Sequence, residues 1–274
     1  MTDFICAKCG KKGIQTGNFI DMIPNTKDLM AKGQTGFTKF VRSLQATFDG
    51  KNFESNAVWS HWLTNLVFLK HIKNGDKIID LGAGSCELEF LISLEKPKST
   101  MVVEDLAPSG LRELAKEYPK SVVAMKNDIC DCLHIQKPQF DVAIMSHVLE
   151  HNEKSRSLKL LDDAISLLKP HGKVLICAEN GTGIHDMHPD GKYHFYFFGH
   201  DELIELLTQR NITIDNEYGL RLKYEESSRI LNDEDARVFR RLKDMDAPSG
   251  WLVNLFALPY PKLCRDLIII GHIS

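Results

Sequence analysis

The chain has 274 residues, of which 43% are hydrophobic and 26% charged, a balance typical of a protein with a packed core rather than of a disordered one. The formal net charge of −3 gives no general attraction to nucleic acid or to an anionic membrane. No apolar run is long enough to span a membrane, and the first residues lack the apolar core of an export signal. We therefore expect a cytoplasmic protein with reduced thiols and neither nucleic acid nor membrane as a partner.

Residues 1–58 are interpreted as an N-terminal segment that is polar and irregular, with a short helical stretch at 36–46. Cys6 and Cys9 form half of a zinc-ribbon pattern. Because no second CxxC pair follows, free thiols are favoured over a zinc site. A clearer helix is predicted at 59–72, where apolar residues recur at helical spacing and Gly75 follows the end.

From residue 77 onward, short apolar runs alternate with amphipathic segments, which indicates a parallel sheet covered by helices on both faces. Right-handed crossovers make this α/β fold a Rossmann-like, doubly wound, mostly parallel sheet. We expect strands at 77–81, 100–104, 121–125, 140–145, 173–177, 212–222 and 263–273, and helices at 87–94, 109–117, 154–168, 200–209 and 232–243. Residues 59–274 would form one domain, with a cap insertion at about 221–262.

A glycine turn follows the first of these strands, in the segment KIIDLGAGSC. Gly82 and Gly84 allow the backbone to turn sharply and approach a ligand, and the next helix offers free N–H groups. The second strand ends at Glu104 and Asp105, where a carboxylate can accept hydrogen bonds from both hydroxyls of a ribose. Since parallel strands end at one edge of the sheet, these segments should face one crevice. A dinucleotide dehydrogenase fits less well, because its pattern requires glycine at Glu87.

The ordered motifs DLGAGS, EDLAPSGLRELA, NDI and FDVAIMSHVLEH resemble those of class I S-adenosylmethionine-dependent methyltransferases, close to the small-molecule group. The resemblance spans about residues 59–206 and implies S-adenosylmethionine as the cofactor. It also implies that the first motif and the segment after the fourth strand hold the methionine portion, an acid after the second strand binds the ribose, and NDI contacts adenine. The positions that inherit these roles are Asp80, Gly82, Ala83, Gly84, Asp105, Asp128, Ile129, Ser146 and His147, with Glu104 as the alternative ribose acid. Cys86 stands where the family often has a third glycine.

The candidate catalytic residue is His151, a few residues after the fourth strand. Histidine titrates near neutral pH, so it can accept the proton of a hydroxyl acceptor; capping of the following helix is the alternative role. The loop after the fifth strand contains four possible metal ligands, His185, Asp186, His188 and His194. Spacing on a loop specifies a metal site poorly, so we assign no metal and expect the loop, with Tyr193, Phe195 and Tyr196, to form part of the acceptor pocket.

The sequence thus predicts methyl transfer from S-adenosylmethionine to a small-molecule acceptor. Oxygen is favoured over nitrogen or carbon as the methylated atom, and a sugar or glycan precursor is the favoured acceptor. One alternative is a cofactor-binding regulatory or partner subunit without turnover of its own, and another is a protein or RNA methyltransferase. The arginine-rich helix at 232–243 could face an anionic acceptor, although a solvated helix face is the more common explanation for such a charge run.

Overall fold

The computed structural model describes residues 2–5, 10–23, 56–130, 138–181, 194–222, 233–244 and 254–274. Several sequence-based expectations lie outside these described residues: the helix at 36–46, and the residues Cys6, Cys9, His185, Asp186, His188 and Tyr193.

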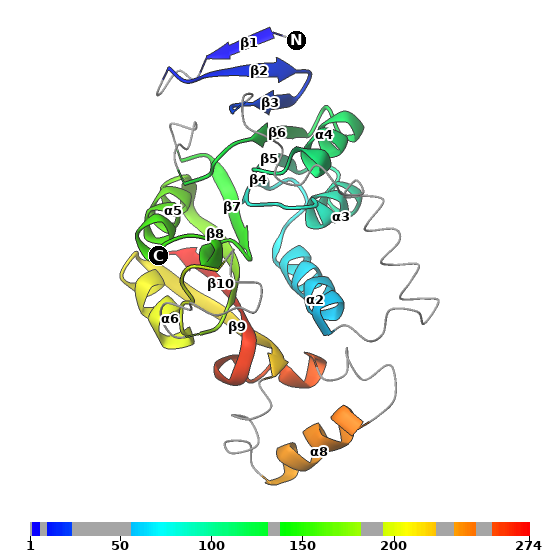
Figure 1. Cartoon of the computed structure of the whole chain (residues 1–274), viewed down its shortest axis with the longest axis vertical. Coiled ribbons are helices and arrows are strands. Elements are labelled where there is room, and N and C mark those ends of the chain that lie inside the picture. Colours follow the sequence, from blue (N-terminus) through cyan, green and yellow to red (C-terminus); the bar gives the residue numbers. More distant parts are fainter. Residues whose placement is uncertain are drawn as a thin grey trace.

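A ten-stranded sheet runs through the described part of the protein (Figure 1), in the order β1-β2-β3-β6-β5-β4-β7-β8-β10-β9. Its strands are β1 Thr2–Ile5, β2 Lys12–Thr16, β3 Phe19–Asp21, β4 Lys77–Leu81, β5 Thr100–Asp105, β6 Val122–Lys126, β7 Phe140–Ser146, β8 Leu168–Glu179, β9 Ile212–Leu222 and β10 Cys264–Ile273. The strands from β3 to β8 run parallel to their neighbours, whereas the outer pairs at both edges are antiparallel. The predicted Rossmann-like, mostly parallel sheet is confirmed.

The chain builds this sheet outward in two directions. It proceeds from β4 to β5 and β6, and then returns to place β7 on the other side of β4. The carboxyl ends of β4 and β7 therefore flank the point where the strand order reverses. In open α/β sheets a ligand crevice forms outside the strands at such a switch point.

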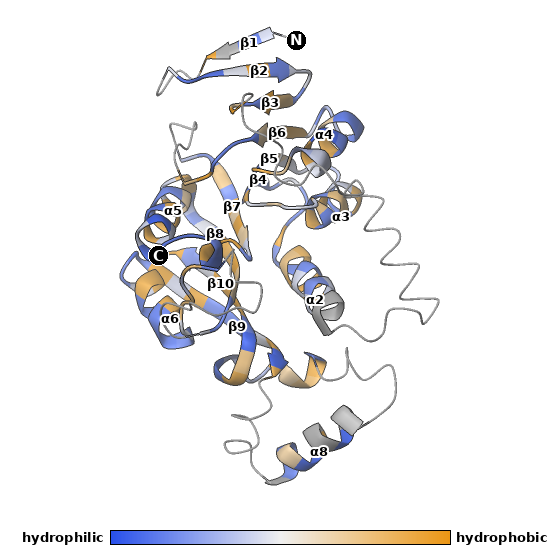
Figure 2. Ribbon diagram, viewed as in Figure 1, coloured by the Kyte–Doolittle hydropathy of each residue, from blue (hydrophilic) through white to orange (hydrophobic). Residues whose placement is uncertain are grey.

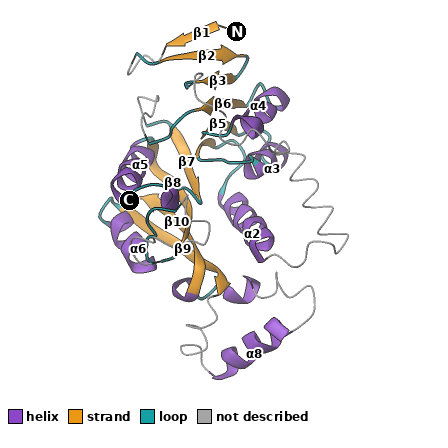
Figure 3. Ribbon diagram, in the orientation of Figure 1, coloured by secondary structure: helices purple, strands orange, loops and turns teal. Residues whose placement is uncertain are grey.

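Helices cover both faces of the sheet, as Figure 3 shows. The helices are α2 Asn56–His71, α3 Glu87–Glu95, α4 Pro108–Glu117, α5 Lys154–Ser166, α6 His200–Thr208 and α8 Asp233–Asp244, with short 3₁₀ turns η1 at Leu149–His151 and η2 at Pro261–Leu263. Residues of α2, α3 and α4 share one core cluster with one side of the strands, and residues of α5 and α6 share the other. None of the helices in the described ranges is long and apolar enough to cross a membrane.

The continuous apolar pattern of the central strands follows from this two-sided burial. In β4, Ile78 packs toward α2, α3 and α4, and Ile79 packs toward α5 and α6, with both side chains fully buried. A parallel strand covered on both faces has no solvent side, so it reads as an unbroken apolar run. Figure 2 shows the hydrophobic residues gathered on the sheet strands and on the helix surfaces that face them.

The expectation of an irregular N-terminal segment is wrong for residues 2–5 and 10–21, because β1, β2 and β3 extend the sheet beyond β6. Each of these strands has three to five residues, which is too short for an alternating pattern to emerge. Their order comes from tertiary pairing: β3 lies parallel to β6, and Phe19 and Ile20 are buried there. The strand expected at 173–177 is also longer, since β8 begins at Leu168, before the expected turn.

Candidate functional site

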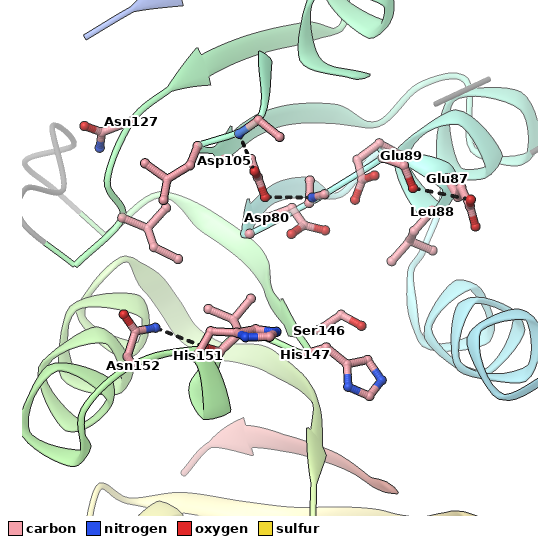
Figure 4. A pocket seen from close by; sticks show the side chains of 18 of the residues that line it. Asp80, Glu87, Leu88, Glu89, Asp105, Asn127, Ser146, His147, His151 and Asn152 are labelled. Carbon is pink, nitrogen blue, oxygen red and sulfur yellow. Dashed lines mark hydrogen bonds between the residues drawn. The ribbon is translucent and has the colours of Figure 1, made fainter. Parts of the chain in front are cut away.

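A cavity of about 680 Å³ opens beside the carboxyl ends of β4, β5 and β7, at the switch point of the sheet (Figure 4). All of the described residues that the sequence assigned to cofactor binding or catalysis line it: Asp80, Gly82, Ala83, Gly84, Asp105, Asp128, Ile129, Ser146, His147 and His151. The structure therefore brings together side chains that are up to 71 positions apart in the sequence.

The turn after β4 has the tight backbone that its glycines predict. Gly82 has φ 95° and Gly84 has φ 55°, both in the left-handed region. The amide of Gly82 donates a hydrogen bond to the carbonyl of Glu104 at 2.7 Å, which ties the turn to β5. Cys86, at the position of the family's third glycine, also takes a left-handed conformation, with φ 61°, and is fully buried. The turn thus closes without a third glycine.

The two glycines have different surroundings. A Cβ atom at Gly82 would lie 2.2 Å from Cγ2 of Val148, whereas a Cβ atom at Gly84 would meet nothing within 4 Å. The space beside Gly84 belongs to the cavity. The backbone at Gly84 is therefore open to close approach by a ligand, while Gly82 is held against the segment after β7.

This difference predicts unequal effects of alanine at the two glycines. Gly84→Ala should lower the free energy of unfolding by about 1–2 kcal/mol, the cost of a left-handed alanine. Gly82→Ala should cost about 1–3 kcal/mol more, because the new methyl group also overlaps Val148. Urea unfolding of both variants measures the difference. Equal stabilities would show that the turn relaxes away from Val148 without cost.

Asp105, rather than Glu104, presents its carboxylate to the cavity. Its Oδ2 accepts a hydrogen bond from the amide of Gly84 at 2.7 Å, and its Oδ1 accepts one from the amide of Ala107 at 2.6 Å. Burial raises the pKa of Asp105, and these backbone hydrogen bonds oppose the rise by favouring the ionised form. The carboxylate is thus fixed in position, and each oxygen keeps a second lone pair for a ligand.

Glu104 is buried within the sheet and does not line the cavity. Its Oε2 accepts a hydrogen bond from Nδ2 of Asn127 at 3.0 Å. Burial raises the pKa of Glu104 to about 7, and the bond from Asn127 acts in the opposite direction. The alternative ribose acid therefore lies behind the cavity wall.

Two buried carboxyl groups, Asp80 and Glu89, stand side by side at the base of the glycine turn (Figure 4). Asp80 is 2% exposed and Glu89 1% exposed, and both line the cavity. Burial raises the pKa of each, and in the case of Asp80 the charge of Glu89 and the hydrogen bond between the two carboxyls raise it further. Within the described residues, Oδ1 of Asp80 and Oε2 of Glu89 have no hydrogen-bond partner. The motifs did not single out Glu89, because its place on an amphipathic helix does not reveal which way it points.

The segment after β6 contributes Asn127, Asp128 and Ile129 to the cavity. Asp128 pairs with Arg156 of α5, whose Nη2 donates to both carboxylate oxygens, at 2.9 and 3.0 Å. This pair anchors the segment to α5 and uses much of the hydrogen-bonding capacity of the Asp128 carboxylate. Ile129 packs against the core cluster on the α5 side, so its apolar surface borders the cavity.

His147, directly after β7, is held on both sides of its ring. Its Nδ1 lies 3.0 Å from Oε1 of Glu150, and its Nε2 lies 3.4 Å from Sγ of Cys177. Burial alone would lower the pKa of His147, but the hydrogen bonds and charges of Cys177 and Glu150 outweigh it and raise the pKa well above its usual value. The residue has φ 53°, an uncommon conformation for a non-glycine residue.

The helix before the first motif also reaches the cavity, through His61 and Asn65 of α2. The ring of His61 lies 5.2 Å from that of His147. Burial and the neighbouring His147 lower the pKa of His61 to about 4, so it is neutral at physiological pH. The sequence predicted this helix but gave no sign of its contribution to the site, since the pattern shows a helix and not what it packs against.

His151 lies on η1, and its side chain is among those that line the cavity (Figure 4). Its ring lies 4.7 Å from the ring of His194, and the carbonyl of Glu150 accepts a hydrogen bond from the amide of Phe195 at 2.8 Å. These contacts bring the end of the loop after β8 onto the cavity wall, where Phe195 is a lining residue. Tyr196 does not line the cavity, because its hydroxyl bonds to Lys154 and Glu202.

No arrangement of three or more His, Cys, Asp or Glu side chains suited to a metal ion occurs within the ranges that the structure describes. Among the same residues, the cavity lining contains no lysine or arginine. The three lining histidines are His61, His147 and His151, while its acidic residues are Asp80, Glu87, Glu89, Asp105 and Asp128. The cavity thus has an acidic side along β4, α3 and β5 and a histidine-rich side along α2 and β7.

Comparison with known proteins gives a family and a fold. Residues 53–217, more than half of the chain, match the family described as a methyltransferase domain. No curated protein gives a significant sequence match.

Three similar solved structures each share less than a fifth of their sequence with the chain. A Burkholderia thailandensis 1,6-didemethyltoxoflavin-N1-methyltransferase with bound S-adenosylhomocysteine has a TM-score of 0.53 and 17% identity, over 90% of this chain and 94% of that one. A chain in the complex of the Haloferax volcanii Trm112 methyltransferase activator has a TM-score of 0.55 and 14% identity, over 87% and 95%. A Haemonchus contortus phosphoethanolamine N-methyltransferase 2 in complex with S-adenosyl-L-methionine has a TM-score of 0.52 and 18% identity, over 78% and 53%.

Proposed function

Because the chain belongs to the methyltransferase domain family and is an S-adenosylmethionine-dependent methyltransferase, we propose that its cavity binds this cofactor and presents the methyl group to a small-molecule acceptor. One observation supports this proposal above all. The described residues that the sequence motifs assign to the cofactor all line the same cavity. These residues come from β4, β5, β7 and the loops that follow β4, β6 and β7.

The residues present fit the cofactor. Gly84 leaves open space where a ligand can approach the backbone, and Asp105 offers a fixed carboxylate for ribose hydroxyls. Asn127 and Ile129 would border the adenine, and Asp80 and Ser146 the methionine portion. When bound, the cofactor supplies a methyl group already activated for displacement by its sulfonium centre. The protein then has to orient the acceptor in line with that methyl group and exclude water from the reacting atoms.

We further propose an oxygen acceptor, with a sugar or glycan precursor as the favoured class. The histidine-rich side of the cavity supports this choice, because Asn65 and neutral His61 can hydrogen-bond hydroxyl groups, and Phe195 offers a flat apolar surface. The absence of lysine and arginine from the described lining argues against a phosphorylated acceptor. His151 would act as the general base that removes the hydroxyl proton.

Two parts of the proposal concern the protein as a whole. We propose that residues 1–58 form an N-terminal segment and that residues 59–274 form a methyltransferase domain with a cap at about 221–262. We also retain the cytoplasmic location that the sequence predicts.

A methyl-transfer assay with labelled S-adenosylmethionine tests this function. The purified protein should transfer label to members of a panel of sugars and small hydroxylated compounds, and the rate should rise with pH as the general base loses its proton. A flat pH–rate profile would contradict the histidine base and move the proposal to a nitrogen or carbon acceptor. Cofactor binding without any labelled product across the panel would instead favour a partner subunit without turnover.

A further inference from the structure

We infer that Glu89 and Asp80 together form the binding site for the α-ammonium group of the cofactor's methionine portion. This inference rests on the proposed cofactor binding and adds Glu89, which belongs to none of the sequence motifs, as a second ligand of the ammonium. It also implies that the cofactor binds with the release of a proton.

The position of Glu89 follows from the local fold. Asp80 is the fourth residue of β4 and points to the α3 face, while Glu89 is the third residue of α3, one short turn later. The tight turn formed by Gly82 and Gly84 folds the first turn of α3 back over the end of β4. The two carboxyl groups therefore meet on one wall of the cavity (Figure 4).

Among the described residues, one oxygen of each carboxyl group in this pair has no hydrogen-bond donor. Both side chains are at most 2% exposed, yet Oδ1 of Asp80 and Oε2 of Glu89 have no partner within the described residues. A buried carboxylate oxygen without a donor is costly, and an ammonium group carries three donors and the opposite charge. One ammonium could bond both carboxyl groups at once, which a neutral ligand group could not do as strongly.

The charges around the pair also favour a cation. The carboxylate of Asp105 from β5 raises the pKa of both carboxyl groups, and that of Glu87 from α3 raises the pKa of Glu89. The adjacent thiol of Cys86 is neutral, because burial raises its pKa well above the usual value. No lysine or arginine among the described lining residues opposes this negative field.

Binding of the ammonium at this pair should release a proton, and that release can be measured. Two buried carboxyl groups side by side do not readily both ionise, and burial raises the pKa of each, so we expect the empty pair to share one proton and carry one negative charge. When the ammonium donates to both carboxylates, that proton leaves to solvent, and the bound pair carries two negative charges beside one positive charge. Because the empty site holds more protons than the filled site, affinity should increase as pH rises through the titration of the pair.

A comparison of two nucleoside ligands distinguishes binding at the Asp80–Glu89 pair from binding elsewhere in the cavity. S-adenosylhomocysteine carries the amino-acid portion, whereas 5′-methylthioadenosine has the same adenosine and lacks the ammonium. Titration calorimetry of each ligand, in two buffers of different ionisation enthalpy at neutral pH, measures affinity and proton release together. For the wild-type protein, S-adenosylhomocysteine should release up to one proton more than 5′-methylthioadenosine. Any contribution of Asp105 cancels, since both ligands contain the ribose.

Glu89→Gln should weaken S-adenosylhomocysteine binding by about 10- to 100-fold, as expected for loss of a charged hydrogen bond, and should abolish the extra proton release. Its affinity for 5′-methylthioadenosine should stay within about twofold, since that ligand does not reach the pair. Glu95→Gln is the matched control: it removes the same charge from the same helix, at an exposed position that does not line the cavity. It should change S-adenosylhomocysteine affinity by less than about threefold.

Equal proton release for the two ligands, or unchanged S-adenosylhomocysteine affinity in a folded Glu89→Gln protein, would overturn the inference. The wild-type comparison needs no variant, so it decides the matter even if Glu89→Gln does not fold. If the folded wild-type protein binds neither nucleoside, the proposed cofactor binding fails and this inference fails with it. If it binds both, with equal proton release, only this inference fails.

Discussion

His151→Ala should lower turnover with a hydroxyl acceptor by about 10²–10⁴-fold, the usual effect of losing a general base, with little change in S-adenosylhomocysteine affinity. Hydroxyl groups hold their protons at neutral pH, so the transferring enzyme needs a base near the methyl group. His151 lines the cavity beside the end of the loop after β8, where we expect the acceptor to bind. Steady-state kinetics and calorimetry on the variant separate the two effects.

His147→Ala is the informative comparison for this prediction. His147 lines the same cavity, but both of its ring nitrogens are engaged, by Glu150 and by Cys177. It is therefore expected to shape the site rather than to accept the acceptor's proton. If His151→Ala keeps full turnover at neutral pH while His147→Ala loses it, the role of the base passes to His147. If both variants keep it, the reaction needs no histidine base.

Asp105→Ala should weaken cofactor binding by about 2–4 kcal/mol, the scale of losing hydrogen bonds to a charged group. The structure shows a second reason, besides the lost ribose contact, for a lower cofactor affinity. Asp105 accepts hydrogen bonds from the amides of Gly84 and Ala107, so the alanine variant also frees the glycine turn from β5. Calorimetry with S-adenosylhomocysteine measures the affinity, and thermal unfolding shows whether the fold persists.

Two further variants separate these causes. Asp105→Asn keeps an oxygen that can accept one backbone bond, so it should retain more of the turn while still losing the charge. Glu104→Gln alters the neighbouring carboxyl, which is buried behind the cavity wall and bonded to Asn127. We expect Glu104→Gln to change stability rather than cofactor affinity. Unchanged affinity in Asp105→Ala combined with a large loss in Glu104→Gln would reverse the assignment of the ribose acid.

The central sheet could be predicted from the sequence because its signals are local and strong. β4 spans the expected residues 77–81, and the other central strands begin or end within one or two residues of expectation, except β8. These strands are mainly apolar, as expected for strands buried on both faces, and their alternation with amphipathic helices leaves few topologies. The short strands β1, β2 and β3 could not be predicted, since their residues carry no clear alternation and their order depends on pairing with β6.

The site residues that could be predicted from the sequence are those in the glycine turn and at the ends of strands. Gly82, Gly84 and Asp105 lie at positions fixed by the strands before them, so their meeting at one edge of the sheet follows from the topology. Glu89 and His61 could not be assigned in the same way, because they are on helices whose inward faces depend on tertiary packing. The roles of the lining residues stay predictions, which the variants above address one at a time.

A crystal structure of the protein with S-adenosylhomocysteine tests the central claim most directly, because it locates the ligand in the cavity. We expect the ribose hydroxyls to bond to Asp105, the amino-acid portion to point toward Asp80, and the sulfur to face the space between Ser146 and His151. A cavity that stays empty at saturating ligand, or a nucleoside bound elsewhere on the protein, would contradict it.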